Sequence, residues 1–230
     1  MWLSRVLFNK KVIIQSLGLQ SYSAVMSTMK RIVEAKMPGK DKQPPEIVDD
    51  YLFLCQHHPV YTVGIRTKDY MDTEVINRLK ELDAEYQYTD RGGLITFHGP
   101  GQLVCYPVLN LKNYGWTLRC YIHKLEQVVM DTCQQFGVET HRTDDVGIWI
   151  GNEKIAAIGV HCQRHITSHG LALNCNTDLS WFGHIVPCGL QGKSMTSLSR
   201  QLDDIVTVEH VTPHLLDKFQ RVFGCEMVEK

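Results

Sequence analysis

The chain lacks several features that define whole classes of protein. No Cys-x-x-Cys pair occurs among its eight cysteines, and 230 residues are far more than a small disulfide-held domain contains. We therefore interpret the cysteines as reduced thiols. No apolar run reaches the ~18 residues that a membrane-spanning helix needs. Neither a Walker phosphate loop nor a dinucleotide-binding glycine pattern is present.

An excess of either charge is also missing. The chain has 24 Lys and Arg against 25 Asp and Glu, which gives a formal net charge of -1. Without a basic stripe, nucleic acid is not the expected partner. Hydrophobic residues make up 43% of the chain, enough for one large core. We therefore expect a single domain over residues 12–230.

Acidic residues are absent from the first 33 positions, which carry five basic residues and several serines. This composition is typical of a mitochondrial import signal, although a basic first strand and helix would have it too. Strand-like Val12-Ile13-Ile14 follows very early. Any import segment is therefore expected within residues 1–11, and the expected location is the mitochondrial matrix.

Apolar residues recur at helical spacing in several stretches. A helix is predicted over about 21–36, with an apolar stripe of Tyr22, Val25, Met26, Met29 and Val33, and a short one after Asp72 or Thr73. A longer helix over about 117–136 ends at Gly137, with an expected apolar stripe of Leu118, Ile122, Leu125, Val129 and Phe136. In the last helix, Thr212 is the expected N-cap and Pro213 the first residue.

Strand-like segments alternate with these helices. They lie at 51–54, 60–63, 94–97, 104–111, 147–150, 154–160 and 170–174. Gly151-Asn152 joins two of them as a hairpin turn. Hairpins mixed with four helices predict an α/β sandwich with a mixed sheet rather than a doubly wound parallel one.

The segment Arg91 to Gln102 is rich in glycine. Paired glycines let the backbone approach a ligand closely, and their N–H groups can bind oxygens. Arg91 can pair with an anion or a carbonyl, and His98 leaves a strand as the chain turns. A Gly-rich hairpin with a surface histidine would have the same spacing, so both interpretations stay open at this point.

Lys154 begins an apolar strand, Lys-Ile-Ala-Ala-Ile-Gly. A lysine beside a turn is ordinarily a solvated charge. If it instead points into an apolar pocket, it can activate a thiol, either as a neutral base or as a cation that holds a thiolate. In Ser168 to Asn174, apolar residues could line a tunnel. His169 could polarise a carbonyl there, but satisfying a backbone group is its expected role.

Cys188 lies between Pro187 and Gly189, on a tight loop that can present a reactive side chain. An ordinary thiol has a pKa of ~8.5, so Cys188 needs a neighbour to become a good nucleophile. Composition does not identify that neighbour, because partners meet only in space. Any one of eight cysteines could equally be an inert core residue.

Together these motifs resemble one family. Arg-Gly-Gly-x-x-Thr-x-His-x-Pro-Gly-Gln at 91–102, Lys-Ile-Ala-Ala-Ile-Gly at 154–159, Ser-His-Gly-Leu-Ala-Leu-Asn at 168–174 and Pro-Cys-Gly-Leu at 187–190 occur in this order. The set resembles the octanoyltransferases of lipoate synthesis, over about residues 12–225. The acid-free start resembles that of a mitochondrial member.

The resemblance implies the α/β fold of the biotin/lipoate protein ligase superfamily, a mixed-sheet sandwich. It implies transfer of octanoyl from the 4'-phosphopantetheine arm of acyl carrier protein to a lysine of a lipoyl domain. That domain belongs to the glycine-cleavage H protein or a 2-oxoacid dehydrogenase subunit. No bound cofactor or metal is implied, because exchange between two thioesters needs no nucleotide.

The resemblance also implies residue roles. Cys188 is the acyl-thioester nucleophile, Lys154 tunes the pKa of its thiol, and His169 is a possible supporting residue. The substrate-binding residues would be Arg91, Gly92, Gly93, Leu94, Ile95, Thr96, Phe97, His98, Ala157, Ile158, Gly159, Gly170, Leu171 and Ala172.

Three alternatives remain from the sequence. An ATP-dependent lipoate or biotin ligase would keep a strand lysine but would have no use for Cys188. A non-catalytic carrier of acyl chains or lipoyl domains would keep only the pocket. Cys120-x-x-His123 and Cys162-x-x-His165 raise the possibility of a zinc-binding module, although structural zinc sites bring four ligands at tight spacing.

Overall fold

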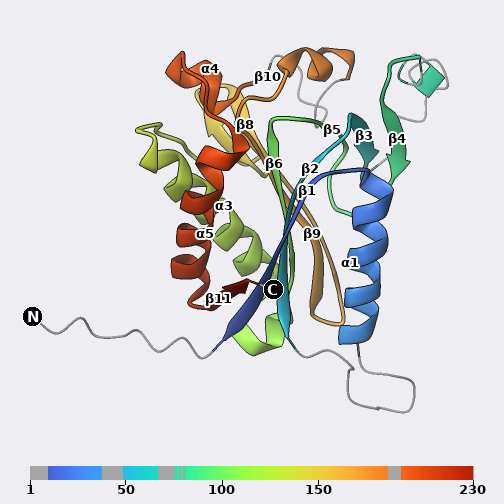
Figure 1. The fold of residues 1–230 in the computed structure, drawn as a ribbon, viewed down its shortest axis with the longest axis vertical. Coiled ribbons are helices and arrows are strands. Elements are labelled where there is room, and N and C mark those ends of the chain that lie inside the picture. Colours follow the sequence, from blue (N-terminus) through green and yellow to red (C-terminus); the bar gives the residue numbers. More distant parts are fainter. Residues whose placement is uncertain are drawn as a thin grey trace, which may run out of the picture.

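A large mixed sheet forms the centre of the molecule (Figure 1). The computed structural model describes residues 10–37, 49–66, 76–77, 79, 81–185 and 193–229. In this part of the chain the large sheet has the order β10-β8-β9-β6-β2-β1-β11, and β7 pairs with β8. Its strands are β1 (Lys11–Gln20), β2 (Asp50–His57), β6 (Gln102–Val108), β7 (Ile148–Ile150), β8 (Glu153–Gln163), β9 (Ile166–Asn174), β10 (Ser194–Met195) and β11 (Glu226–Glu229).

This sheet contains both parallel and antiparallel pairs. β1 runs parallel to β2 and β11, while β6 runs antiparallel to β2 and β9, and β8 antiparallel to β9. A smaller sheet has the order β4-β3-β5, with β3 (Val60–Val63), β4 (Glu85–Tyr88) and β5 (Ile95–His98). The predicted α/β fold with a mixed sheet is confirmed.

Helices cover both faces of the large sheet (Figure 1). On one face lie α3 (Leu118–Gln135) and α5 (Val208–Phe223), and on the other lies α1 (Tyr22–Lys36). The remaining described helices are α4 (Leu198–Leu202) and two 3-10 helices, η2 (Leu111–Tyr114) and η3 (Leu179–His184). None of the described helices is long and apolar enough to cross a bilayer.

Two details of the helix predictions were wrong. Helix α5 begins at Val208 after Thr207, and Pro213 lies inside it. Thr212 does not cap the helix, because its hydroxyl donates back to the carbonyl of Val208 at 2.7 Å. In α3, Leu118 is exposed and Ile122 half-buried, because the buried stripe runs through Tyr121, Leu125, Val128, Val129 and Cys133 instead.

Other predictions fall partly outside the described residues. Most of the short helix expected after Asp72 lies there, as do residues 1–9 of the expected import segment. The hairpin at Gly151-Asn152 is confirmed, since β7 and β8 flank it and Gly151 has a φ of 55°.

A buried ion pair joins the end of α1 to the start of β2. The ammonium of Lys36 lies 2.9 Å from the carboxylate of Asp50, and the two side chains are 2% and 5% exposed. Lys36 also donates to the carbonyl of Asp49, and the backbone N–H of Asn110 donates to Asp50. Burial raises the pKa of Asp50, and the charge of Lys36 opposes this shift. The pair therefore ties α1 to the sheet.

Replacing Asp50 should test this connection. Asp50→Asn keeps the shape but leaves the ammonium of Lys36 buried without its carboxylate, so the free energy of unfolding should fall by about 3 kcal/mol in urea titrations. The matched control is Glu34→Gln, which breaks the exposed Lys30–Glu34 pair on the same helix. That change should cost less than about 0.5 kcal/mol. Equal effects of the two variants would show that the buried pair adds no stability.

Candidate active site

A cavity lies between the segment 91–98 and the strands β8, β9 and β6 of the large sheet. Its narrow interior has a volume of about 50 Å³. Twelve of the fourteen residues expected to bind substrate line it: Arg91, Gly92, Gly93, Leu94, Thr96, His98, Ala157, Ile158, Gly159, Gly170, Leu171 and Ala172. Lys154 and His169 line it as well. The structure thus brings together three motifs that are far apart in the sequence.

Ile95 and Phe97 do not line this cavity. They are 0% and 1% exposed and belong to the small hydrophobic cluster around Tyr61 and Phe182. Successive side chains of a strand point to opposite faces. On β5, Thr96 therefore faces the cavity and its two neighbours face the cluster.

Small residues make room for the cavity on β8 and β9. Ala157 pairs with Ala172, and Gly159 pairs with Gly170. A side chain at Gly159 would lie 3.0 Å from the carbonyl oxygen of Gly92, and one at Gly170 would collide with the carbonyl oxygen of Cys105. Any larger residue at either glycine would therefore displace neighbouring backbone.

Arg91 holds in place the segment 91–98, which covers the cavity and is called its roof below. Its guanidinium donates to the carbonyl oxygens of Thr62 at 2.7 Å, Leu94 at 2.9 Å and Gly92 at 3.0 Å. The backbone N–H of Gly92 also donates to the carbonyl of Val160 on β8 at 2.9 Å. These bonds connect the segment to both sheets, so Arg91 has a structural role beside any contact with a ligand.

Lys154 is buried at the start of β8, with 2% exposure. Its ammonium donates to the carbonyl of Val146 at 3.1 Å and lies 4.7 Å from the centre of the Trp149 ring. Gly147, at a φ of 130°, passes so close that a side chain there would lie 3.3 Å from that ammonium. Lys154 is therefore not a solvated turn lysine, because these groups direct its charge towards the cavity.

Cys188 lies outside the described residues, together with the rest of 186–192. The described chain resumes at Lys193, close to Lys154. Strand β10 pairs in parallel with Glu153 and Lys154, and the N–H of Thr196 donates to the carbonyl of Lys154 at 3.0 Å. Lys193 forms a 2.6 Å ion pair with Asp145. Residues 193–196 are therefore held beside Lys154.

Two buried histidines lie on the side of the cavity formed by β2, β5 and β6. His98 Nδ1 lies 2.7 Å from Gln102 Oε1. Burial lowers the pKa of His98 to about 3, and the charge of His57 acts in the same direction. His57 contacts the hydroxyl of Tyr106 at 2.9 Å, and burial lowers its pKa to about 4. Both rings are therefore neutral near pH 7.

A polar chain leads from these rings to the β10 segment. The side-chain amide of Gln102 donates to Asn174 at 2.8 Å, and Asn174 donates to the carbonyl of Thr196 at 2.9 Å. Thr196 in turn donates to Lys154 through its backbone. The histidine side of the site is thereby linked to the lysine side.

His169 bonds to a carboxylate rather than to the backbone group that the sequence suggested. Its Nε2 lies 2.7 Å from Asp90 Oδ1, and this bond is the main cause that lowers the pKa of Asp90 to about 2. Burial lowers the pKa of His169, and Asp90 opposes this shift. The residue has a φ of 56°, which sets its direction from the strand.

Sequence reasoning missed several lining residues. Tyr22, Val104 and Tyr106 all face the cavity, from α1 and β6. No motif marks them, and Tyr22 was assigned only to an apolar helix stripe. The alternation along β6, where Val104 and Tyr106 share one face, is the signal that could have indicated the latter two.

An open groove adjoins the cavity on the side of Lys154. Both are lined by Gly92, Gly93, Leu94, Val146, Lys154, Ile158 and Gly159. Exposed apolar residues lie along the groove: Ile65 is 65% exposed, Val146 44% and Leu118 40%. A substrate can therefore reach Lys154 from this surface.

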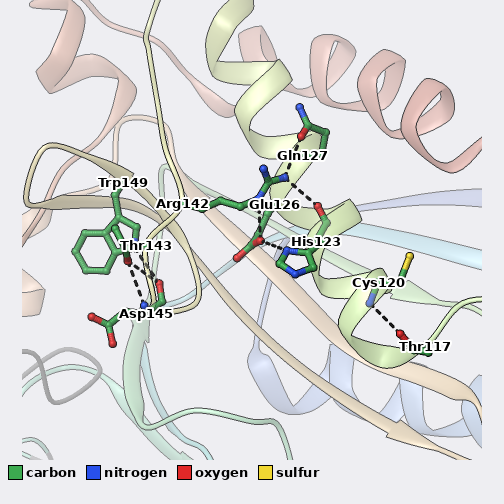
Figure 2. Close-up of polar contacts among 9 residues, drawn as sticks. All are labelled: Thr117, Cys120, His123, Glu126, Gln127, Arg142, Thr143, Asp145 and Trp149. Atoms are coloured by element: carbon green, nitrogen blue, oxygen red, sulfur yellow. Dashed lines mark hydrogen bonds and ion pairs between the residues drawn. The ribbon is translucent and has the colours of Figure 1, made fainter.

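The cysteines and histidines of the zinc alternative make other contacts. Figure 2 shows that His123 pairs with Glu126 at 3.0 Å, and that Arg142 binds the same carboxylate at 3.0 Å. The backbone N–H of Cys120 donates to Thr117, the N-cap of α3. Among the residues that the structure describes, no three His, Cys, Asp or Glu side chains gather in a way that could hold a metal ion.

Comparison with known proteins identifies relatives over most of the chain. The family model of the lipoyl protein ligase A/B catalytic domain matches residues 9–220. The protein from Danio rerio named octanoyl-[acyl-carrier-protein]:protein N-octanoyltransferase LIPT2, mitochondrial, is 46% identical over 211 residues, 92% of each chain. The Homo sapiens protein of that name is 49% identical over 183 residues, 78% of each chain. An octanoyltransferase of Caldanaerobacter subterraneus is 41% identical and covers 85% of this chain and 86% of its own.

Solved structures of the same fold are more distant in sequence. A lipoate-protein ligase A bound with ATP has a TM-score of 0.72 at 14% identity and covers 96% of this chain and 88% of its own. A putative lipoate protein ligase of T. acidophilum with bound lipoic acid has a TM-score of 0.70 at 13% identity, with the same coverage. At such identities the likeness establishes the fold alone, which agrees with the predicted superfamily.

The neutral histidines should make the protein sensitive to acid. Because the pKa of His57 is lowered from 6.5 to about 4, the unfolded state binds an additional proton between these values. Stability is therefore present above pH 6.5 and falls as the pH drops towards 4. In His57→Gln, the slope of unfolding free energy against pH should shrink by up to about 1.4 kcal/mol per pH unit in this window.

The exposed neighbour His58 provides the control. His58→Gln should leave the slope unchanged, measured by urea unfolding at a series of pH values. An equal slope in His57→Gln and the wild type would show that His57 takes up its proton in the folded protein.

Proposed function

Because this chain belongs to the lipoyl protein ligase A/B catalytic family, we propose a covalent mechanism for it, with octanoyl carried as a thioester on Cys188. The chain is an octanoyltransferase of protein lipoylation and a mitochondrial protein, as its relatives at 46% and 49% identity are. The observation that supports the mechanism best is the burial of Lys154 between the lined cavity and the open groove.

The first half-reaction exchanges one thioester for another. The Cys188 thiolate attacks the octanoyl carbonyl of the donor and forms a new C–S bond. The donor thiolate leaves and takes up a proton. The two thioesters have nearly equal free energy, so this step needs neither nucleotide nor metal, and we propose that no cofactor is bound. The donor would be octanoyl on the 4'-phosphopantetheine arm of acyl carrier protein, in keeping with the relatives' names.

The second half-reaction forms an amide. The neutral amine of a lysine on a lipoyl domain attacks the enzyme thioester, the C–S bond breaks, and the departing Cys188 sulfur takes up the proton that the nitrogen loses. Candidate acceptors are the glycine-cleavage H protein and 2-oxoacid dehydrogenase subunits. An amide is much more stable than a thioester, so the step runs forward. Donor and acceptor would enter in turn, which gives ping-pong kinetics.

Lys154 would take part in both steps. The parallel pairing of β10 with Glu153 and Lys154 returns the chain to the lysine a few residues after Cys188. A protonated Lys154 would stabilise the thiolate, and a neutral Lys154 would accept the thiol proton. Carbonyl oxygen gains charge in both half-reactions, and backbone N–H groups of the glycine-rich segment are candidates to stabilise it.

The cavity residues would hold the octanoyl chain. Ala157, Ala172, Gly159 and Gly170 leave space over the paired strands, and Arg91 through His98 form the roof. The acyl chain would then extend from Lys154 along β8 and across β9. Ile95 and Phe97 would support the roof from behind without touching the chain.

A ligase mechanism is the main alternative, because the solved structure with a TM-score of 0.72 is a ligase bound with ATP. A ligase would transfer from an adenylate and would require ATP. Turnover that depends on ATP and persists in Cys188→Ala would therefore replace the proposed mechanism.

Intact-protein mass spectrometry tests the thioester directly. Mixing the enzyme with octanoyl-acyl carrier protein, without nucleotide or acceptor, should give a single octanoyl adduct that hydroxylamine removes. Cys188→Ala should show no adduct, whereas Cys120→Ala, which removes a half-buried thiol on α3, should behave as the wild type does. An adduct retained in Cys188→Ala, or absent from folded wild-type protein, contradicts the mechanism.

A Lys154 variant can show whether the side chain acts on the Cys188 thiol or only on folding. Lys154→Met keeps a similar length and removes the charge, so adduct formation should slow by about a hundredfold or more. Its pH–rate profile should also change, because the thiol loses its helper. A slow rate with an unchanged profile would mean that Lys154 acts on the structure rather than on the thiol. Thermal melts of both proteins show whether the variant is folded.

A further inference from the structure

Two side chains separate the cavity described above from a second groove, and together they are called the wall below. The second groove has a volume of about 690 Å³ and lies between α1, β4 and the far ends of β8 and β9. The residues that line both the cavity and this groove are Tyr22 and His169.

Both wall residues are held firmly. Tyr22 is the first residue of α1 and is 4% exposed. Its ring stacks on His98 at 6.5 Å between centroids and lies 5.3 Å from the His57 ring. His169 is fixed by its bond to Asp90.

The wall lies at the end of the cavity that is remote from Lys154. Strand β8 runs from Lys154 through Ala157 and Gly159 to Val160, and Val160 pairs with His169 on β9. The open groove meets the cavity at Lys154 and continues along β8 as far as Cys162. A chain whose carbonyl lies near Lys154 therefore points its other end towards Tyr22.

Helix α1 gives the groove beyond the wall an apolar stripe, flanked by the polar residues Ser23, Lys30 and Glu34. Met26, Met29 and Val33 line it from successive turns of α1. Unbranched methionine side chains adapt to an alkyl chain more readily than branched ones do. An acyl chain that passed the wall would therefore find an apolar surface to lie on.

We propose that the ring of Tyr22 closes the end of the cavity and so sets the longest acyl chain that the enzyme transfers. This inference rests on the proposed function, since it concerns the same cavity. It makes Tyr22 a specificity-determining residue at the far end from the reacting carbonyl, on a helix that carries none of the family motifs.

The ring, rather than the hydroxyl, forms the barrier. Tyr22 Oη is buried and has no hydrogen-bond partner among the described residues. Removing it therefore breaks no bond. Tyr22→Phe is thus a matched control that keeps the barrier, whereas Tyr22→Ala removes it.

The test compares octanoyl, decanoyl, dodecanoyl and tetradecanoyl donors on acyl carrier protein, with rates of transfer to a lipoyl domain. In Tyr22→Ala, the ratio of dodecanoyl to octanoyl transfer should rise at least about tenfold, because several methylenes gain a place to bind. In Tyr22→Phe the ratio should stay as in the wild type. Tyr22→Leu is the second variant if the alanine protein fails to show a cooperative melt.

A double variant shows where the longer chain goes. Met26→Trp fills the groove beside α1, so adding it to Tyr22→Ala should cancel the gain for dodecanoyl. Met26→Trp alone should leave the ratio unchanged, because the chain does not reach the groove while Tyr22 is present.

The outcomes separate this inference from the proposed function. If folded Tyr22→Ala and Tyr22→Leu transfer octanoyl yet keep the wild-type ratio, the wall does not limit chain length and the inference is wrong. If the gain survives Met26→Trp, the longer chain takes another path and the assignment of the groove is wrong. If the wild type transfers no octanoyl at all, the proposed function fails and this inference with it.

Discussion

The hydrogen bond from Gly92 to the carbonyl of Val160 is the contact on which the rest of the site depends. It holds the glycine-rich segment against β8 at 2.9 Å, and the cavity is the space left between them. Such close approach is possible because Gly159 has no side chain, and because Arg91 satisfies carbonyls of both the segment and β3. The roof, the floor and the position of Lys154 follow from this contact.

Local patterns predicted most of the elements, because each depends on neighbours in the sequence. The strands around Gly151 and the helix before Gly137 form where turn and cap residues demand them. The start of α5 was predicted wrongly since Thr207 and Thr212 are both plausible caps, and only tertiary packing of Val208 chooses between them. Likewise, the motif at 91–102 predicted a cavity-lining stretch without showing which of its side chains face the cavity.

Contacts between distant segments could not be predicted from one sequence. Asp90 pairs with His169, Lys36 with Asp50, and Gln102 with Asn174, at sequence separations of 79, 14 and 72 residues. Tyr22 belongs to the same group. It was assigned to an apolar stripe, which is correct for its burial, yet its position at the end of a cavity depends on β6 and β9 folding beneath it. Roles of this kind depend on fold geometry rather than on residue type.

The surroundings of Lys154 fit the part that we propose for it in both half-reactions. Its ammonium is held by the carbonyl of Val146 and the face of Trp149, which attract a cation without neutralising it. The same ring also lies 4.6 Å from the ammonium of Lys193, which Asp145 balances through its ion pair. A protonated Lys154 in this setting keeps its charge available to an anion that approaches from the cavity. In the proposed mechanism that anion would be the Cys188 thiolate, before acylation and again when the amide forms, so a protonated Lys154 would favour the leaving group in the second step as well as the nucleophile in the first.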